Sequence, residues 1–267
     1  MRYSCLTLLV AVAAPVAAQS SIEAQAAANM ARGDLLYAYD QSAWHVTDAA
    51  LKAIPKSSMN LLRGYIVTPT EGGYRTTFYG GEAGSHFRIY SATWSNRSVV
   101  QAELPAPEQR VPVSADEARL IAAKTLALGS LDQLTRCSGA KLNAAVVPGT
   151  TPQDPISVYI LTPSTRRDAI PMGGHHRIDV KDGAVVSKRN FTKTCIELER
   201  PQASKRQGQP VAMMISHLLD PVPTEIHAFA VHSVGLPMYV AMPDGTLYSV
   251  QLDRGRAVAR KTNQRVR

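Results

Sequence analysis

The sequence lacks the motifs of common hydrolases and nucleotide-binding proteins. It contains no G-x-S-x-G, no H-E-x-x-H, no P-loop and no G-x-G-x-x-G. Ser138-Gly139-Ala140-Lys141 matches the S-x-x-K pattern of serine–lysine acyl enzymes, but neither S-D-N nor K-T-G accompanies it. These absences favour a non-catalytic protein. The alternative is a hydrolase whose active-site residues are dispersed along the chain, since catalytic groups need not be neighbours in sequence.

Long hydrophobic runs are also lacking beyond the N-terminus. Arg2 precedes a largely apolar stretch from Leu6 to Ala18, which ends in the small-residue pattern of a signal-peptidase site. This stretch is too short to span a bilayer, and the longest purely apolar run after it is Val211–Ile215. The sequence therefore predicts a bacterial signal peptide over residues 1–18, cleavage near Ala18, and a periplasmic or secreted protein with no transmembrane segment in the mature chain.

Cysteine is scarce, with three residues in 267. Removal of the leader removes Cys5 and leaves Cys137 and Cys195. Two cysteines in an oxidising compartment are most simply interpreted as one disulfide. A reactive thiol is the alternative, although the sequence contains no C-x-x-C and neither residue lies in a recognisable nucleophile motif.

Acidic residues are fewer than basic ones, 21 against 29, and the net charge is +8. Six of the basic residues lie in the last fourteen, which contain no acidic residue. Without these and Arg2, the net charge of the remaining chain is about +1. We therefore expect residues 254–267 to form a basic, disordered tail that contacts anionic surfaces, and we expect no nucleic-acid partner.

The chain also contains similar segments that suggest an internal repeat. Each copy has a Y-I-x-T-P segment, then a segment ending in H-x-R-I, then a Val-Val pair, and a fainter third copy starts at Tyr239. The matched pairs are Tyr65–Thr70 with Tyr159–Ser164, Gly84–Ile89 with Gly173–Ile178, and Val99-Val100 with Val185-Val186.

Hydrophobic periodicity and turn signals predict an α+β fold of repeated units, each a helix followed by an antiparallel meander, two clear and a third fainter. The units cover residues 19–110, 111–200 and 201–253, with a polar linker near 200–210. Helices are predicted over 22–32 with Gly33 as the stop, over 42–54, and over 115–128 after a capping box at Ser114. Strands are predicted near 63–68, 73–79, 86–94 and 98–103, near 141–147, 156–162, 174–180 and 184–194, and near 211–217, 225–232, 236–242 and 246–252.

The second unit resembles a PepSY-type module over residues 111–190. The resemblance rests on the helix 115–128, on Val158-Tyr159-Ile160-Leu161, and on His175-x-Arg177-x-Asp179 running into Lys181-Asp182-Gly183-Ala184-Val185. PepSY-type modules are small extracytoplasmic α+β units found in protease propeptides and bacterial envelope proteins. The resemblance implies a binding or inhibitory module and carries over no catalytic residue.

A polar and aromatic strand face is the candidate ligand-binding site. Ten of the sixteen aromatic residues lie between Tyr37 and Trp94. Strict alternation along 86–94 would place His86, Arg88, Tyr90 and Trp94 on one face. Arginine beside tyrosine and tryptophan can bind an anionic peptide or a glycan, and an ordinary solvent-exposed face is the alternative. The candidate residues are Arg75, Tyr79, His86, Arg88, Tyr90, Trp94, His175 and Arg177.

The predicted strand 225–232 carries two residue types that ligate metals. Glu225 and His227 are two apart and would share a face there, with His217 or His232 as the third ligand. Histidines on strands more often occupy half-exposed sheet positions, so we predict no metal and no cofactor. The sequence as a whole predicts a non-catalytic binding module whose partner is a protein, peptide or glycan of the cell envelope.

Overall fold

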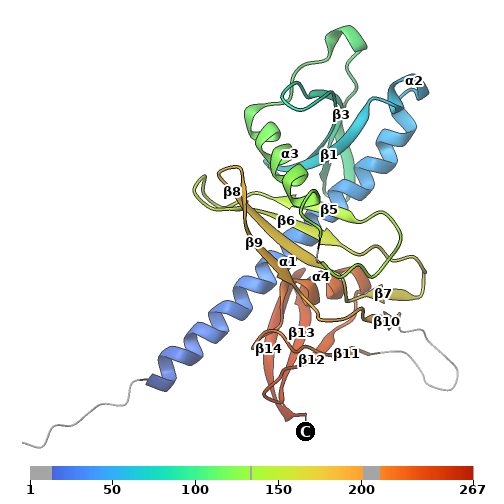
Figure 1. The fold of residues 1–267 in the computed structure, drawn as a ribbon. Coiled ribbons are helices and arrows are strands. Elements are labelled where there is room, and N and C mark those ends of the chain that lie inside the picture. Colours follow the sequence, from blue (N-terminus) through green and yellow to red (C-terminus); the bar gives the residue numbers. More distant parts are fainter. Residues whose placement is uncertain (1–13, 133, 201–210, 267) are drawn as a thin grey trace, which may run out of the picture.

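A computed structural model describes residues 14–132, 134–200 and 211–266 of the chain (Figure 1). It confirms the α+β class, with three four-stranded sheets of order β1-β2-β3-β4, β5-β6-β8-β9 and β11-β12-β13-β14, and a small β7–β10 ribbon. The elements are α1 (Ala14–Ala53), α2 (Lys56–Met59), β1 (Leu62–Thr70), β2 (Gly73–Gly80), β3 (Phe87–Ser95), β4 (Ser98–Glu103), the 3₁₀ turn η1 (Pro107–Gln109), α3 (Ala115–Leu128), β5 (Asn143–Val147), β6 (Ile156–Leu161), β7 (Ala169–Pro171), β8 (His176–Lys181), β9 (Ala184–Asn190), β10 (Glu197–Glu199), β11 (Met213–Ser216), α4 (Glu225–Val234), β12 (Met238–Ala241), β13 (Thr246–Asp253) and β14 (Arg256–Arg265).

Helix α1 is one continuous helix, whereas the sequence predicted two with a stop at Gly33. That stop is wrong because Gly33 lies where α1 crosses α4. A Cβ atom on Gly33 would lie 2.4 Å from Cβ of Ala228 and 2.6 Å from the carbonyl oxygen of Glu225. The glycine therefore allows two helices to approach closely and does not end the first one.

Helix α1 runs along the molecule from the third sheet to the first and contributes to two hydrophobic cores (Figure 1). Its middle part, with Met30 and Leu36, packs in one core with α4 and the third sheet. Its C-terminal part, with Val46 and Ala50, packs on Phe78 of the first sheet. The N-terminal turns project from the body, and residues 21–25 are exposed.

The first two sheets follow the predicted strands closely, and α3 begins at the predicted capping box. Ser114 accepts from the backbone N–H of Glu117, and the Glu117 carboxylate accepts from the N–H of Ser114. The repeat remains a prediction. The H-x-R-I segments lie in β3 and β8, each third in its sheet, but Y-I-x-T-P lies in the edge strand β1 and in the inner strand β6.

The C-terminal unit differs most from the prediction. Residues 225–234 form helix α4, not a strand, and α4 connects β11 to its parallel neighbour β12. Thr224 precedes the helix, and its N–H donates to Nδ1 of His227 at 2.9 Å, in the manner of a capping box. Gly235 ends the helix with φ +78°, a left-handed conformation that glycine adopts without strain.

The predicted disordered tail is also wrong, because residues 256–265 form strand β14. The turn before it uses positive φ at Arg254 and Gly255, which lets β14 pair antiparallel with β13. Ala257 faces the core, while Arg260 pairs with Asp253 at 2.9 Å on the surface. β14 lies at the edge of its sheet, and its exposed basic side chains are typical of an edge strand.

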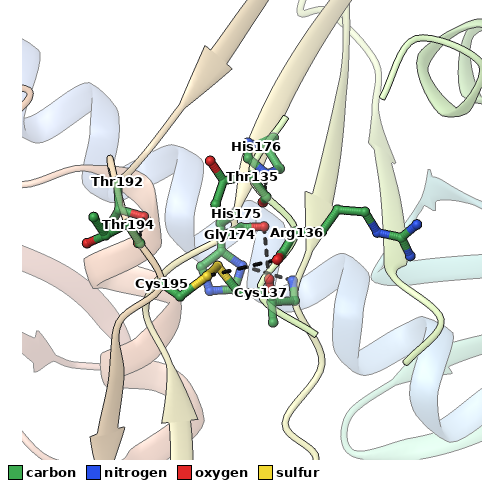
Figure 2. Close-up of a disulfide and its surroundings, with 10 residues drawn as sticks. Thr135, Arg136, Cys137, Gly174, His175, His176, Thr192, Thr194 and Cys195 are labelled. Carbon is green, nitrogen blue, oxygen red and sulfur yellow. Dashed lines mark hydrogen bonds between the residues drawn. A yellow bond between two sulfur atoms is a disulfide. The ribbon is translucent and has the colours of Figure 1, made fainter. Parts of the chain in front are cut away.

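The predicted disulfide joins Cys137 to Cys195, with a Cα–Cα distance of 5.3 Å. It ties the segment before β5 to the segment before β10, beside Gly174 and His175 (Figure 2). A Cβ on Gly174, whose φ is +73°, would lie 2.7 Å from Sγ of Cys137, so this position requires glycine.

Two predicted segments fall largely outside the described residues, namely positions 1–13 of the leader and 201–210 of the linker. Across the part of the chain that the structure describes, no helix is long and apolar enough to cross a membrane.

Candidate functional site

The predicted ligand-binding face does not exist as one surface, because a β-bulge interrupts β3. Tyr79 pairs with Arg88 while Phe78 pairs with Tyr90, which leaves Ile89 as an extra residue in the strand. The bulge reverses the alternation, so Arg88 faces α3 and Tyr90 faces α1. Arg88 donates to the α3 residue Glu117, and Tyr90 packs in the core that contains the C-terminal part of α1.

The remaining candidates on the first sheet are divided in the same way. Tyr79 is buried in the core beneath α3. Trp94 lies on the α1 side, where its ring stacks on His45 with centroids 3.9 Å apart. Arg75 donates to Ser91 at 2.6 Å and pairs with Glu103. These residues hold strands and helices together, and only His86 lines a large groove.

The two candidates on the second sheet are structural as well. His175 is buried, accepts from the N–H of Thr162 and donates to the carbonyl of Pro171. Burial lowers the pKa of His175 to about 4, so the ring is neutral near neutral pH. Arg177 donates to the fully buried carboxylate of Glu225 at 2.9 Å.

The possibility of a metal site at Glu225 and His227 rested on a strand that is in fact a helix. Glu225 accepts hydrogen bonds from Tyr159 and Arg177, and the His227 ring caps the helix. Burial lowers the pKa of His227 to about 3. Within the described ranges, no cluster of three or more His, Cys, Asp or Glu side chains is placed to hold a metal ion.

A groove of about 1040 Å³ lies beside α3 and is called here the α3 groove. One wall is the solvent side of α3. The other is formed by the loop 83–87 and the segment 107–113. The groove is mainly apolar, and its lining consists of Ala83, Gly84, Ser85, His86, Phe87, Pro107, Arg110, Pro112, Val113, Ala118, Ile121, Ala122, Thr125 and Leu126.

The second wall is held by a short extension of the first sheet. The N–H of Arg88 donates to the carbonyl of Val111 at 3.0 Å, and the N–H of Val113 donates to that of His86 at 3.1 Å. Proline at 112, between these two bonds, has no N–H to pair. The segment is therefore fixed at its C-terminal end, and Val111 is left half-exposed beside the groove.

Helix α3 is held in place by a buried carboxylate beneath it. Glu117 accepts from the hydroxyl of Thr77 at 2.9 Å, from the guanidinium of Arg88 at 2.7 Å, and from the N–H of Ser114. Burial by itself raises the pKa of Glu117, but these hydrogen bonds outweigh it and hold the pKa below its ordinary value. The charged form of Glu117 therefore ties α3 to β2 and β3.

Arg110 is the charged residue of the α3 groove. Its guanidinium carbon lies 5.6 Å from the centroid of the Phe87 ring, and Nη2 donates to the hydroxyl of Ser58 at 2.9 Å. Its Nε atom is buried and has no hydrogen-bond partner in the part of the chain that the structure describes. Among the described residues, no carboxylate lies within 4 Å of it. The groove thus combines apolar walls with a cation whose donors are only partly used.

Sequence reasoning missed Arg110, Phe87 and the groove-facing side of α3. A signal was present, since Ala118, Ala122 and Leu126 recur every four residues on a face that the core does not use. In comparisons with protein-family models, curated proteins and solved structures, no significant match to this chain was found.

Proposed function

We propose that this chain is an exported, non-catalytic binding protein whose α3 groove takes an amphipathic anion, a long-chain carboxylate. The observation that carries the proposal is the half-buried guanidinium of Arg110, with an unpartnered Nε, in an otherwise apolar groove of about 1040 Å³. A groove of this size is in the range that small ligands occupy. An unpaired buried donor costs free energy that a ligand carboxylate would recover.

Export is part of the proposal. The described Cys137–Cys195 disulfide supports an oxidising compartment, since such bonds are rare in the reducing cytosol. Expression of the full chain in a bacterium, fractionation and mass spectrometry test it. We expect a mature N-terminus at Gln19 in the periplasmic or extracellular fraction. An intact leader in the cytoplasmic fraction would overturn this part.

The binding part is tested with a matched pair of ligands. Dodecanoate and dodecyltrimethylammonium have the same apolar chain and opposite charges, and each is titrated below its micellar concentration against the bound dye 1-anilinonaphthalene-8-sulfonate. We expect dodecanoate to displace the dye at a concentration at least about tenfold lower, because a hydrogen bond to a charged group contributes about 1.5–3 kcal/mol. Equal displacement by both ligands would contradict a role for Arg110.

Two variants test the location. Arg110→Gln is expected to weaken dodecanoate about tenfold, and Ala122→Phe is expected to abolish dye binding because the new ring enters the groove from α3. Arg97→Gln is the control, since Arg97 is exposed in the turn after β3 and outside the groove lining. If Ala122→Phe binds dye and dodecanoate like the unmodified chain, the ligand is elsewhere.

A further inference from the structure

A second, smaller cavity of about 170 Å³ lies between α1, the end of β6 and α4. Its apolar surface comes from Leu161 at the end of β6 and from Ile226 and Phe229 on α4. None of the residues lining it lines the α3 groove, so the two sites are separate.

Two charged residues of opposite sign line this cavity. Asp40, on α1, is half-buried, while Arg200, just after β10, is exposed. Among the described residues, neither has an oppositely charged side-chain atom within 4 Å, so they do not pair with each other. His175 also lines the cavity, but both of its ring nitrogens are hydrogen-bonded within the protein.

The other polar groups around the cavity are mostly occupied. The hydroxyl of Thr162 donates to the carbonyl of Gly174, and that of Ser233 donates to the carbonyl of Phe229. Burial raises the pKa of Asp40 to about 6, although a hydrogen bond with the Gln41 side chain acts in the opposite direction, so near neutral pH Asp40 is mainly a carboxylate in a poorly hydrated place. A carboxylate there without a basic partner carries a desolvation cost that a bound cation would offset.

We propose that this cavity binds a small zwitterion, an α-amino acid with an apolar side chain. The ammonium group of the ligand contacts Asp40 inside, its carboxylate contacts Arg200 at the mouth, and its side chain packs on Leu161, Ile226 and Phe229. One ligand then supplies a partner for each of two opposite charges that the protein leaves unpaired, and apolar contact for the remaining surface.

The test uses three probes that differ by one charged group each. L-leucine has both groups, 3-methylbutan-1-amine lacks the carboxylate, and 4-methylpentanoate lacks the ammonium. Isothermal titration of the full chain is expected to show saturable binding of L-leucine, with each single-charge analogue at least about tenfold weaker. No heat of binding from L-leucine up to about 10 mM would overturn the proposal.

Variants then locate the ammonium. Asp40→Asn is expected to weaken L-leucine at least about tenfold and to leave the weak binding of 4-methylpentanoate unchanged, because that probe has no ammonium to lose. Asp48→Asn, at an exposed position two turns along α1, is the control and should bind like the unmodified chain. An equal loss of affinity for L-leucine and 4-methylpentanoate in Asp40→Asn would show general damage to the cavity and overturn the assigned contact. The comparison of the three probes uses the unmodified chain, so it remains a test even if this variant does not fold.

Discussion

Lys124 gives the most specific prediction about stability, because it is a buried amine with no carboxylate partner among the residues that the structure describes. It lies on the inner side of α3, 8% exposed, and its Nζ donates to the carbonyl of Tyr65 at 2.7 Å. Nζ also lies 4.2 Å from the centroid of the Tyr65 ring. Burial, helped by the like charge of Lys141, lowers the pKa of Lys124 from 10.5 to about 8.

The sign of the pH dependence follows from this shift. Between pH 8 and 10.5 the unfolded chain holds a proton on Lys124 that the folded chain has released, so the free energy of unfolding rises with pH in that window. Below pH 8 both states are protonated, and the folded state carries the full cost of the buried charge. A shift from 10.5 to about 8 corresponds to about 3 kcal/mol.

The measurement compares urea denaturation of the unmodified chain with that of Lys124→Met from pH 7 to 11. Methionine keeps the length of the side chain and has no charge, and other titrating groups cancel in the comparison. Relative to that of the variant, the free energy of unfolding of the unmodified chain should increase by about 3 kcal/mol between pH 7 and pH 11. If the difference in free energy of unfolding between the two proteins stays constant with pH, the claim that burial lowers the pKa of Lys124 is refuted.

Three further predictions concern the disulfide, the helix crossing and the buried histidines. Replacing Cys137 and Cys195 by serine should lower the free energy of unfolding by about 4 kcal/mol, because the bond closes a 58-residue loop, and equal urea midpoints would contradict this. Gly33→Ala should lower the thermal midpoint of unfolding, because the new methyl group would clash with α4. This clash should outweigh the preference of a helix interior for alanine over glycine, which is about 1 kcal/mol. A raised midpoint would show that α1 and α4 can accommodate the methyl group. As pH falls below 6.5, the free energy of unfolding should fall by up to about 1.4 kcal/mol per pH unit for each of His175 and His227, because these rings are protonated there only in the unfolded chain. The urea midpoint of His175→Gln should therefore decrease less between pH 7 and pH 4.5 than that of the unmodified chain.

Local signals in the sequence predicted local structure well. The strands of the first two sheets follow from alternation and from turns such as Asp182-Gly183, where both residues have positive φ. The disulfide follows from there being two cysteines after the leader. The strand prediction for residues 225–232 was wrong because a short apolar run fits a strand and a buried helix equally well, and tertiary packing decides between them.

The candidate site depended on information that the sequence does not carry. The predicted face assumed strict alternation along β3, and one extra residue at Ile89 reverses it. Glu225 was a candidate metal ligand and Arg177 a candidate ligand contact in the sequence. The two are 48 residues apart, and the hydrogen bond between them makes them a structural pair. The sequence did not mark Arg110 as a candidate, because its contacts with Phe87 and Ser58 form only when the segment 107–113 lies along β3.

The distribution of charge separates structural groups from candidate ligand contacts. Interior carboxylates such as Glu117 and Glu225 are met by arginines from other elements, so their charges hold the fold together. Lys124, without a carboxylate partner, hydrogen-bonds to the backbone and lines neither large cavity. Arg110 and Asp40 are half-buried, have no ion pair among the described residues, and each lines a cavity. Folding compensates the desolvation of these two charges only in part, through a hydrogen bond from Arg110 to Ser58 and one between Gln41 and Asp40. A ligand group of opposite charge would supply the ion pair that each charge lacks, and the two cavities are assigned binding roles for this reason.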